Sequence, residues 1–132
     1  MTGETNLSVL IKNMQPVLND GLYVFCSLKP PTGLDFHRMV FFFKEQEGIT
    51  IVVEKTYADA KGFEYTAVFA WITLHVHSAL EAVGLTAAFS NALADNGLSC
   101  NVVAGYYHDH IFVQYDLAEK AVAVLKDLSA SY

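Results

Sequence analysis

The chain is poor in charge, and basic residues are its scarcest charged type. Charged side chains make up 17% of its 132 residues, with eight Lys and Arg against fourteen Asp and Glu, which gives a formal net charge of −6. Nucleic-acid phosphates attract proteins through clustered lysine and arginine. The basic residues here are few and scattered, so we expect no nucleic-acid partner.

Cysteine is also rare. Cys26 and Cys100 are the two cysteines of the chain, and they form neither a metal-binding spacing nor a redox pair. Each falls inside a segment that reads as a strand, where cysteine behaves as a small hydrophobic residue. We therefore expect two buried thiols, no bound metal and no cofactor.

Long apolar runs are absent as well. No run reaches the roughly 20 residues that a membrane-spanning helix needs, so we expect no membrane partner. The first residues, MTGETNLSVLIKNM, lack the charged start and apolar core of a signal peptide. These observations predict a cytoplasmic protein.

Hydrophobic residues, in contrast, are abundant at 53% of the chain. A chain of this length and composition can fill a core and still leave apolar surface for self-association. We expect a homodimer or a higher homo-oligomer.

The most regular segment is 83–103, which reads as a helix followed by a strand. Apolar residues at 85, 88, 89, 92 and 93 recur at helical spacing and mark one buried face. Asn96-Gly97 then ends the helix, because glycine adopts the left-handed conformation without steric penalty. The helix is expected to begin near Gly84.

The other elements follow from periodicity and turn residues. Residues 71–77 alternate, with Ile72, Leu74 and Val76 on one face and Trp71 and the histidines on the other. The run of three phenylalanines at 41–43 predicts a strand buried on both faces. The remaining expectations are a helix at 6–14, a turn at 16–21, strands at 22–28, 38–44, 49–54, 64–70, 99–107 and 110–115, a short helix at 57–61, a tight turn at His108-Asp109 and a final helix capped by Asp116.

Both halves approximate a βαββαβ order, the first with an eroded first helix and the second without its last strand. The sequence therefore predicts an α+β, ferredoxin-like sandwich of two interlocked modules with antiparallel sheets, at residues 1–70 and 71–132. Segment 22–28 is a candidate for the missing edge strand of the second sheet, which would pack the halves as one body.

The histidines raise the question of a metal site. We expect the first and third strands of the second module to lie side by side and parallel, which would place His77 and His110 on the order of 15–20 Å apart. They could then not share an ion without help from a second subunit. The turn Tyr106 to His110 holds an Asp–His pair but no nucleophile in a strand-to-helix elbow. We therefore expect no metal and no catalytic residues, and interpret this turn as a hairpin tip for dimer contact or ligand closure.

Four segments carry a family resemblance: NDGLYVFCSL, EGITIVV, AWITLHVHSALEAVGLTAAFSNALADNGLSCNVVAGYYHDHIFV and the final helix. They resemble small stand-alone bacterial proteins with tandem ACT domains, a family of unassigned function. The family is related to the regulatory domains of aspartokinases. The resemblance implies an ACT-like fold that pairs with itself and binds a small molecule, most plausibly an amino acid.

The resemblance also places the ligand at the loop after the first strand of the second module, against the start of the helix. Gly84 would let the backbone approach a ligand, and the free N–H groups of the helix start would hold a carboxylate. The expected ligand-binding residues are His77, Ser78, Val83, Gly84, Leu85, Thr86 and Asn101.

Three functional hypotheses follow. The first is a non-catalytic regulatory module that binds an amino acid and acts through oligomer pairing. The second is a pure assembly module without a ligand. The third is a small metal-dependent enzyme that uses the histidines.

Overall fold

The computed structural model describes residues 6–29, 33–79 and 82–132, which form two compact units. Unit 1 combines Met1–Asp20 with Ala70–Tyr132, and unit 2 comprises Gly21–Phe69. Residues 6–20 thus pack with the C-terminal half of the chain. The division into sequence modules at residues 1–70 and 71–132 stays a prediction.

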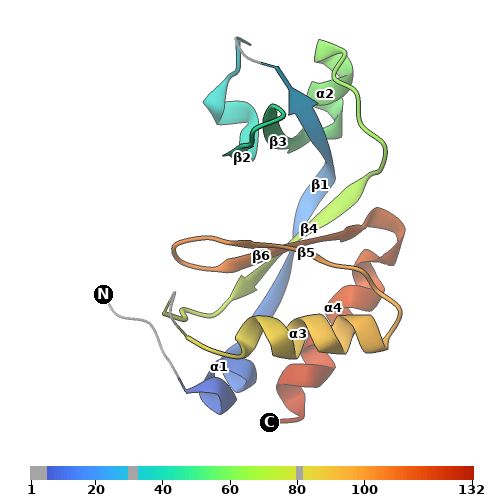
Figure 1. Cartoon of the computed structure of the whole chain (residues 1–132). Helices are drawn as coiled ribbons and strands as arrows, with labels where there is room; N and C mark the ends of the chain where they lie inside the picture. The colour runs from blue at the N-terminus through green and yellow to red at the C-terminus, as the bar shows by residue number, and fades with distance from the viewer. Residues whose placement is uncertain (1–5, 30–32, 80–81) are drawn as a thin grey trace. The chain divides into compact units, whose positions relative to one another are not determined.

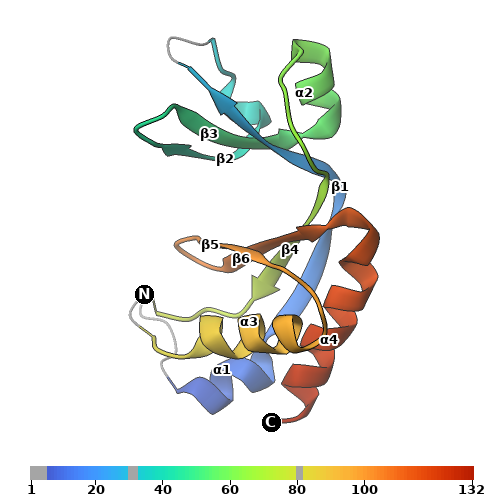
Figure 2. The same cartoon turned by 45° about the vertical axis from the view of Figure 1, so that its right-hand side comes forward.

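Unit 1 is a four-stranded sheet with three helices on one side (Figures 1 and 2). The strand order is β1-β4-β6-β5, the order of a ferredoxin-like module. Its elements are α1 (Leu7–Asn13), the first part of β1 (Gln15–Leu28), β4 (Phe69–His75), α3 (Leu85–Asp95), β5 (Asn101–Ala104), β6 (Asp109–Gln114), the 3-10 turn η2 (Tyr115–Leu117) and α4 (Ala118–Ala130).

Apolar periodicity explains the core of unit 1. Every fourth residue of α3, namely Leu85, Phe89 and Leu93, is buried, as the sequence predicts. Ile72 and Leu74 of β4 are fully buried in the same core. Complete burial of such a side chain is worth roughly 1.5–3 kcal/mol, so these contacts hold the helices on the sheet.

The expected turn at residues 16–21 is wrong, because β1 already begins at Gln15. Asparagine is common in turns, but here Asn19 Nδ2 donates to Trp71 O at 3.1 Å and to Thr73 Oγ1 at 2.9 Å. Residues 15–20 are therefore the edge strand of unit 1, where a proline such as Pro16 is tolerated. The segment 22–28, which was expected at that edge, instead pairs with β3 in unit 2 through residues 23–28.

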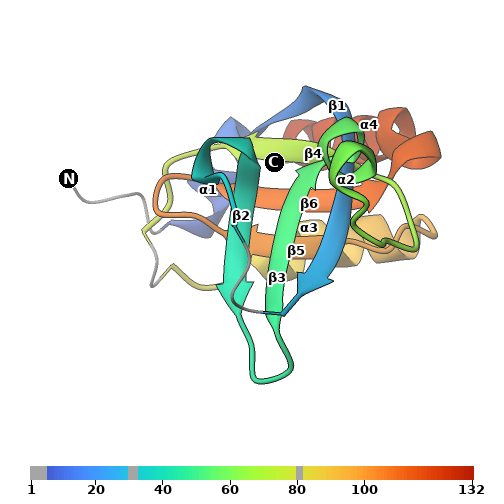
Figure 3. The ribbon, with the colours of Figure 1, turned by 90° about the horizontal axis from the view of Figure 1, so that it is seen from above.

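Unit 2 holds an antiparallel arrangement of three strand segments in the order β2-β3-β1. Figure 3 shows β2 and β3 side by side, joined by their hairpin loop. The further elements are the 3-10 turn η1 (Phe36–Arg38), β2 (Met39–Lys44), β3 (Ile49–Glu54) and α2 (Lys55–Lys61). The only helical segment among the described residues between β1 and β2 is η1.

The phenylalanine run does not lie in a strand buried on both faces. β2 is at the edge of the strand order, and Phe42 and Phe43 are 48% and 64% exposed. Phe42 packs edge-to-face on Phe36 at 5.4 Å between ring centroids. Unit 2 therefore presents an aromatic edge.

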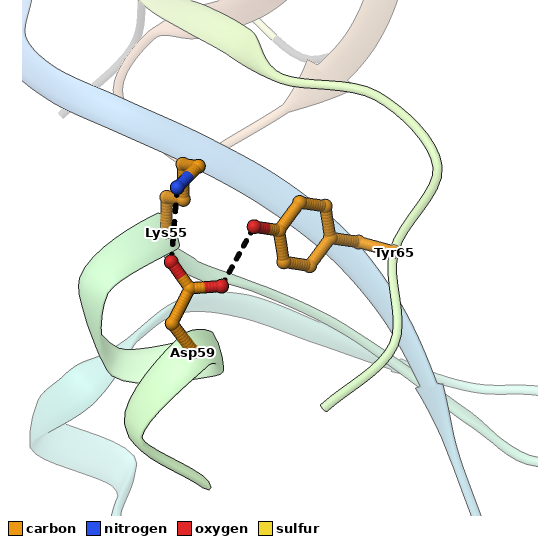
Figure 4. A network of polar contacts seen from close by, with 3 residues as sticks. All are labelled: Lys55, Asp59 and Tyr65. Carbon is orange, nitrogen blue, oxygen red and sulfur yellow. Dashed lines mark hydrogen bonds and ion pairs between the residues drawn. The ribbon is translucent and has the colours of Figure 1, made fainter. Parts of the chain in front are cut away.

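The strand expected at residues 64–70 begins only at Phe69. The segment before it is tied to α2 by polar contacts (Figure 4). Tyr65 donates to Asp59 Oδ1 at 2.7 Å, and Lys55 Nζ lies 2.9 Å from Asp59 Oδ2. The hydrogen bonds from Tyr65 and Lys55 lower the pKa of Asp59 below its ordinary value.

A substitution of Asn19 tests the assignment of residues 15–20 to unit 1. Asn19→Ala removes both hydrogen bonds to β4 and leaves the half-buried acceptors without this donor. We expect the free energy of unfolding to fall by about 1–3 kcal/mol, measured by urea denaturation. The control Asn13→Ala changes an exposed residue at the end of α1 and should shift stability by less than about 0.5 kcal/mol. Equal effects of the two substitutions would contradict the role of Asn19.

Candidate ligand-binding site

The start of α3 is an uncapped helix N-terminus. Its N-cap residue is Gly84, which provides no side-chain hydrogen bond, and no acidic residue lies in the first turn. Helical bonding begins with Ala88 N donating to Gly84 O at 2.9 Å, so the N–H groups of residues 85–87 have no partner within the helix. These groups and the helix dipole make the start of α3 attractive to an anion.

Gly84 is required at this position for two reasons. Its φ of +103° is a conformation that side-chain-bearing residues rarely adopt, and a Cβ would come within 3.0 Å of Leu7 Cδ2. The glycine thus allows α1 to pack against the start of α3. A larger residue would disturb packing as well as any ligand.

A cavity of about 80 Å³ lies beside the start of α3. One wall carries the hydroxyl-bearing residues Ser78 and Thr86, and the other is the turn between β5 and β6. The lining residues are Ser78, Ala79, Ala82, Leu85, Thr86, Ala104, Gly105, Tyr107, His108 and Asp109.

The β5–β6 turn is tightly built. Ala104 pairs with Asp109, and Gly105 N donates to His108 O at 2.9 Å. A Cβ on Gly105 would come within 2.9 Å of His108 O, so only glycine fits. The tight turn therefore lies at Tyr106 and Tyr107 rather than at His108-Asp109, and Asp109 already belongs to β6.

Two polar groups of the turn have unusual surroundings. Burial raises the pKa of Asp109, while the charge of His108 lowers it by a smaller amount. His108 Nδ1 is buried and has no hydrogen-bond partner among the described residues. The His108 ring packs on the His75 ring at 4.6 Å between centroids.

Several of the expected ligand-binding residues come together at this cavity. Ser78, Leu85 and Thr86 line it. Gly84 is the N-cap of α3, one residue before the first lining helical residue. The loop after β4 and the start of α3 therefore meet, as the resemblance implies.

The other expected residues lie apart from the cavity lining. Val83 is 84% exposed. Asn101 is the first residue of β5, whereas Ala104 at the other end of that strand lines the cavity, and Asn101 Nδ2 donates to Phe112 O at 3.3 Å. The His77 ring lies 6.1 Å from the ring of Tyr107, near the rim of the turn.

The turn residues of the site were not among the expected ligand-binding residues. Tyr107, His108 and Asp109 form the densest polar and aromatic stretch of the sequence, which was the available signal. They reach the start of α3 because β4 and β6 run antiparallel. The expectation of parallel strands is wrong, since Thr73 contacts His110 and the more C-terminal His75 contacts the more N-terminal His108.

The antiparallel register brings the rings of His75 and His108 within 4.6 Å of each other between centroids. The expected parallel arrangement would have kept the histidines of these two strands far apart. Nevertheless, within residues 6–29, 33–79 and 82–132 no group of three or more His, Cys, Asp or Glu side chains is arranged to hold a metal ion. His110 is instead bound by neighbours: Trp71 Nε1 donates to its Nδ1 at 3.0 Å, and Thr73 Oγ1 lies 3.1 Å from the same atom. Because the indole N–H can only donate, His110 Nδ1 carries no proton.

The cysteines offer no reactive thiol at the cavity. Cys26 is buried in β1, and Cys100 is half-buried just before β5 rather than inside it. Burial raises the pKa of both thiols, which disfavours the reactive thiolate.

A larger groove of about 580 Å³ in unit 1 is a weaker candidate. It lies at the C-terminal ends of α1 and α4 and includes Lys12 and Lys126 among its lining residues. The helix dipoles place negative partial charge at those ends, which opposes carboxylate binding. The smaller cavity at the start of α3 has the opposite and favourable polarity.

Comparison with known protein families decides the classification. Two ACT-domain family models match the chain, one at residues 2–70 and one at residues 67–127. The chain belongs to the ACT-domain family. ACT domains are regulatory and non-catalytic modules.

Solved structures support this assignment of the fold. The chain is 46% identical to VC0802 of Vibrio cholerae, a protein of unknown function described as a possible transport protein, with a TM-score of 0.84 over 93% of this chain and 95% of that one. Atu0741 of Agrobacterium tumefaciens matches with a TM-score of 0.71 at 16% identity, over 88% and 89% of the chains. The regulatory subunit of aspartate kinase from Thermus flavus matches with a TM-score of 0.63 at 10% identity, over 86% and 96%.

No curated protein matches the sequence. Among the described residues, no helix is long and apolar enough to cross a bilayer.

The state of His110 makes stability dependent on pH. Burial lowers its pKa, and the charges of His108 and His75 lower it further. Between this lowered pKa and about 6.5, the ordinary value, the unfolded chain binds more protons than the folded one. We expect the free energy of unfolding to decrease as pH falls from about 8 through this window, measured by urea denaturation at several pH values.

The variant His110→Gln should show a weaker pH dependence over the same range, because it lacks the titrating ring. An unchanged dependence would contradict the proposed cause. Asp109 has a raised pKa and contributes with the opposite sign at lower pH, so the comparison is confined to the window above.

Proposed function

We propose that this ACT-domain protein binds a free amino acid in the cavity of unit 1 and that binding regulates how copies of the chain pair. The observation that carries the proposal is the uncapped start of α3, which borders a cavity with hydroxyl groups on its wall. We place this regulatory role in the cytoplasm, as the sequence predicts.

The chemistry of a carboxylate fits the helix side of the cavity. Free N–H groups of residues 85–87 and the positive end of the helix dipole stabilise a negative charge. The hydroxyls of Ser78 and Thr86 can add hydrogen bonds to the same group. A cavity of about 80 Å³ has the volume of only two or three water molecules, at roughly 30 Å³ each. The amino-acid head group would fill it, and the side chain would extend toward the exposed Tyr107.

Family membership supports a regulatory ligand. The resemblance to ACT-domain proteins implies amino-acid binding, and the structural neighbours include a regulatory subunit of aspartate kinase. Regulation requires that the ligand bind one pairing state better than another. The free energy of binding then appears as a shift in association between copies of the chain.

A second candidate function is assembly without a ligand. The exposed phenylalanines of the edge strand β2 favour it, because a monomer gains nothing from leaving such rings in water. The two functions predict different results. An amino-acid ligand would stabilise the folded chain, whereas assembly without a ligand predicts that no amino acid changes its stability.

Removal of the Thr86 hydroxyl tests the hypothesis that the cavity binds an amino acid. A ligand bound only by the folded state raises the melting temperature, so we expect at least one of the twenty amino acids to do so. Thr86→Val keeps the shape but removes a hydrogen bond to a charged group, worth about 1.5–3 kcal/mol. The dissociation constant should then rise by about 10-fold or more, measured by calorimetry with the amino acid that raises the melting temperature.

Thr56→Val is the matched control, since Thr56 is likewise an exposed second residue of a helix, in unit 2. It should leave the affinity unchanged. If no amino acid raises the melting temperature, the assembly function is favoured. Gly84→Val is a poor probe, because the clash with Leu7 would alter stability by itself.

A further inference from the structure

We propose that His75, His108 and His110 form an acid-sensitive switch on the face of the unit 1 sheet that the helices leave open. At neutral pH the indole of Trp71 is hydrogen-bonded to His110. Proton uptake by the three histidines releases the indole and loosens the β5–β6 turn. The switch needs no ligand, so it can be tested independently of the proposed function.

The three rings lie on the side of the sheet opposite α1, α3 and α4 (Figure 2). Leu74 of β4 and Ile111 of β6 belong to the core that these helices cover. Side chains alternate along a strand, so the neighbouring His75 and His110 lie on the other face. The ring of His108 is on that face too, because it packs on the His75 ring at 4.6 Å between centroids.

The first observation is the hydrogen bond between Trp71 and His110. Trp71 Nε1 donates to His110 Nδ1 at 3.0 Å. An indole nitrogen is a donor only, so this bond requires that His110 Nδ1 carry no proton. When the ring takes up a proton at Nδ1, two N–H groups face each other and the bond is lost.

An alternative acceptor for the new proton lies nearby. Thr73 Oγ1 is 3.1 Å from His110 Nδ1, and it accepts a hydrogen bond from Asn19 Nδ2 at 2.9 Å. A hydroxyl oxygen has two lone pairs, so it can accept a second bond from protonated His110. The network therefore has two arrangements. In one, Trp71 is bound to the neutral ring, and in the other the charged ring is bound to Thr73.

The surroundings of His110 oppose a positive charge. Burial lowers its pKa, and the charges of His108 and His75 lower it further. Its partner on β5 is the uncharged Val103, and Asp109 precedes it in β6 and so lies on the helix side of the sheet. The switch should consequently respond below about pH 6.5, the ordinary pKa of histidine.

The second observation is the buried Nδ1 of His108, which has no hydrogen-bond partner among the described residues. Both nitrogens of a protonated imidazole are donors, so a charged His108 has a buried N–H that needs an acceptor. The adjacent ring of His75 repels it when both are charged. Both effects favour movement of the His108 ring toward water in acid.

Movement of these rings acts on the β5–β6 turn. Gly105 N donates to His108 O at 2.9 Å. A Cβ on Gly105 would come within 3.2 Å of His110 Nε2, so His110 also lies directly against the turn. Proton uptake by either ring therefore disturbs the contacts that close the hairpin.

Trp71 is the single tryptophan of the chain, so its fluorescence and its indole N–H NMR signal report the switch directly. On the full chain we expect both signals to change in one transition with a midpoint below about pH 6.5. The amide signals of residues 105–108 should change over the same range. The far-ultraviolet circular dichroism should stay that of the folded protein.

Three variants test the cause. His110→Gln keeps a side-chain acceptor but cannot take up a proton, so the transition should disappear. His75→Gln changes an exposed residue and removes a repelling charge, so the midpoint should rise by about 0.5 pH unit. The control His37→Gln changes an exposed histidine in η1 of unit 2 and should leave the midpoint unchanged.

The proposal is wrong if the Trp71 signals stay constant between about pH 8 and pH 5. It is equally wrong if His110→Gln shows the same transition, or if His75→Gln moves the midpoint no more than His37→Gln does. A change of the Trp71 signals that coincides with loss of the circular dichroism would also contradict it, because the transition would then be global unfolding.

Discussion

The antiparallel pairing of β4 with β6 is the constraint on which the candidate site depends. Thr73 lies against His110 and His75 lies against His108, so the chain leaves β4 where it enters β6. The loop to α3 and the β5–β6 turn consequently meet at the same end of the sheet. A parallel pairing would have placed them at opposite ends, and no cavity would form between them.

The features gathered at this end oppose stability. An uncapped helix start, a half-buried carboxylate at Asp109 and an unpartnered buried nitrogen at His108 each cost free energy. The helix start and Asp109 border one cavity, and the His108 ring packs on His75 beside it, whereas the surrounding core of unit 1 is apolar and closely packed. Local violations of packing rules are expected where a protein binds something, because the ligand then supplies the missing partners.

The two units differ in their capacity for such a site. Unit 1 has an eleven-residue helix, α3, after its first strand, and this helix provides both the free N–H groups and one wall of the cavity. In unit 2, the described residues at the corresponding place contain only the three-residue turn η1. Unit 2 instead exposes the aromatic edge of β2. The proposed ligand site accordingly belongs to unit 1, and the β2 edge is the surface that the alternative assembly function would use.

The sequence by itself determined the elements whose signal is local. The helical spacing of residues 85, 89 and 93 predicted α3 and its buried face, and Asn96-Gly97 predicted its end, where Gly97 has a φ of +76°. The segment predicted as a strand at 49–54 is β3 with the same bounds. Such patterns depend on neighbouring residues of the chain, so they can be read without the fold.

Only the tertiary structure decided the features that depend on distant partners. Asn19 is of a residue type that favours turns, yet it lies in a strand. Hydrogen bonds to Trp71 and Thr73, which are more than fifty positions away in the sequence, hold it there. The phenylalanines at 41–43 are apolar enough for a core, but the strand order places β2 at an edge. The meeting of Thr86 with His108 and Asp109 follows from strand direction, which composition and periodicity do not encode, because hydrogen bonding between strands is possible in either direction.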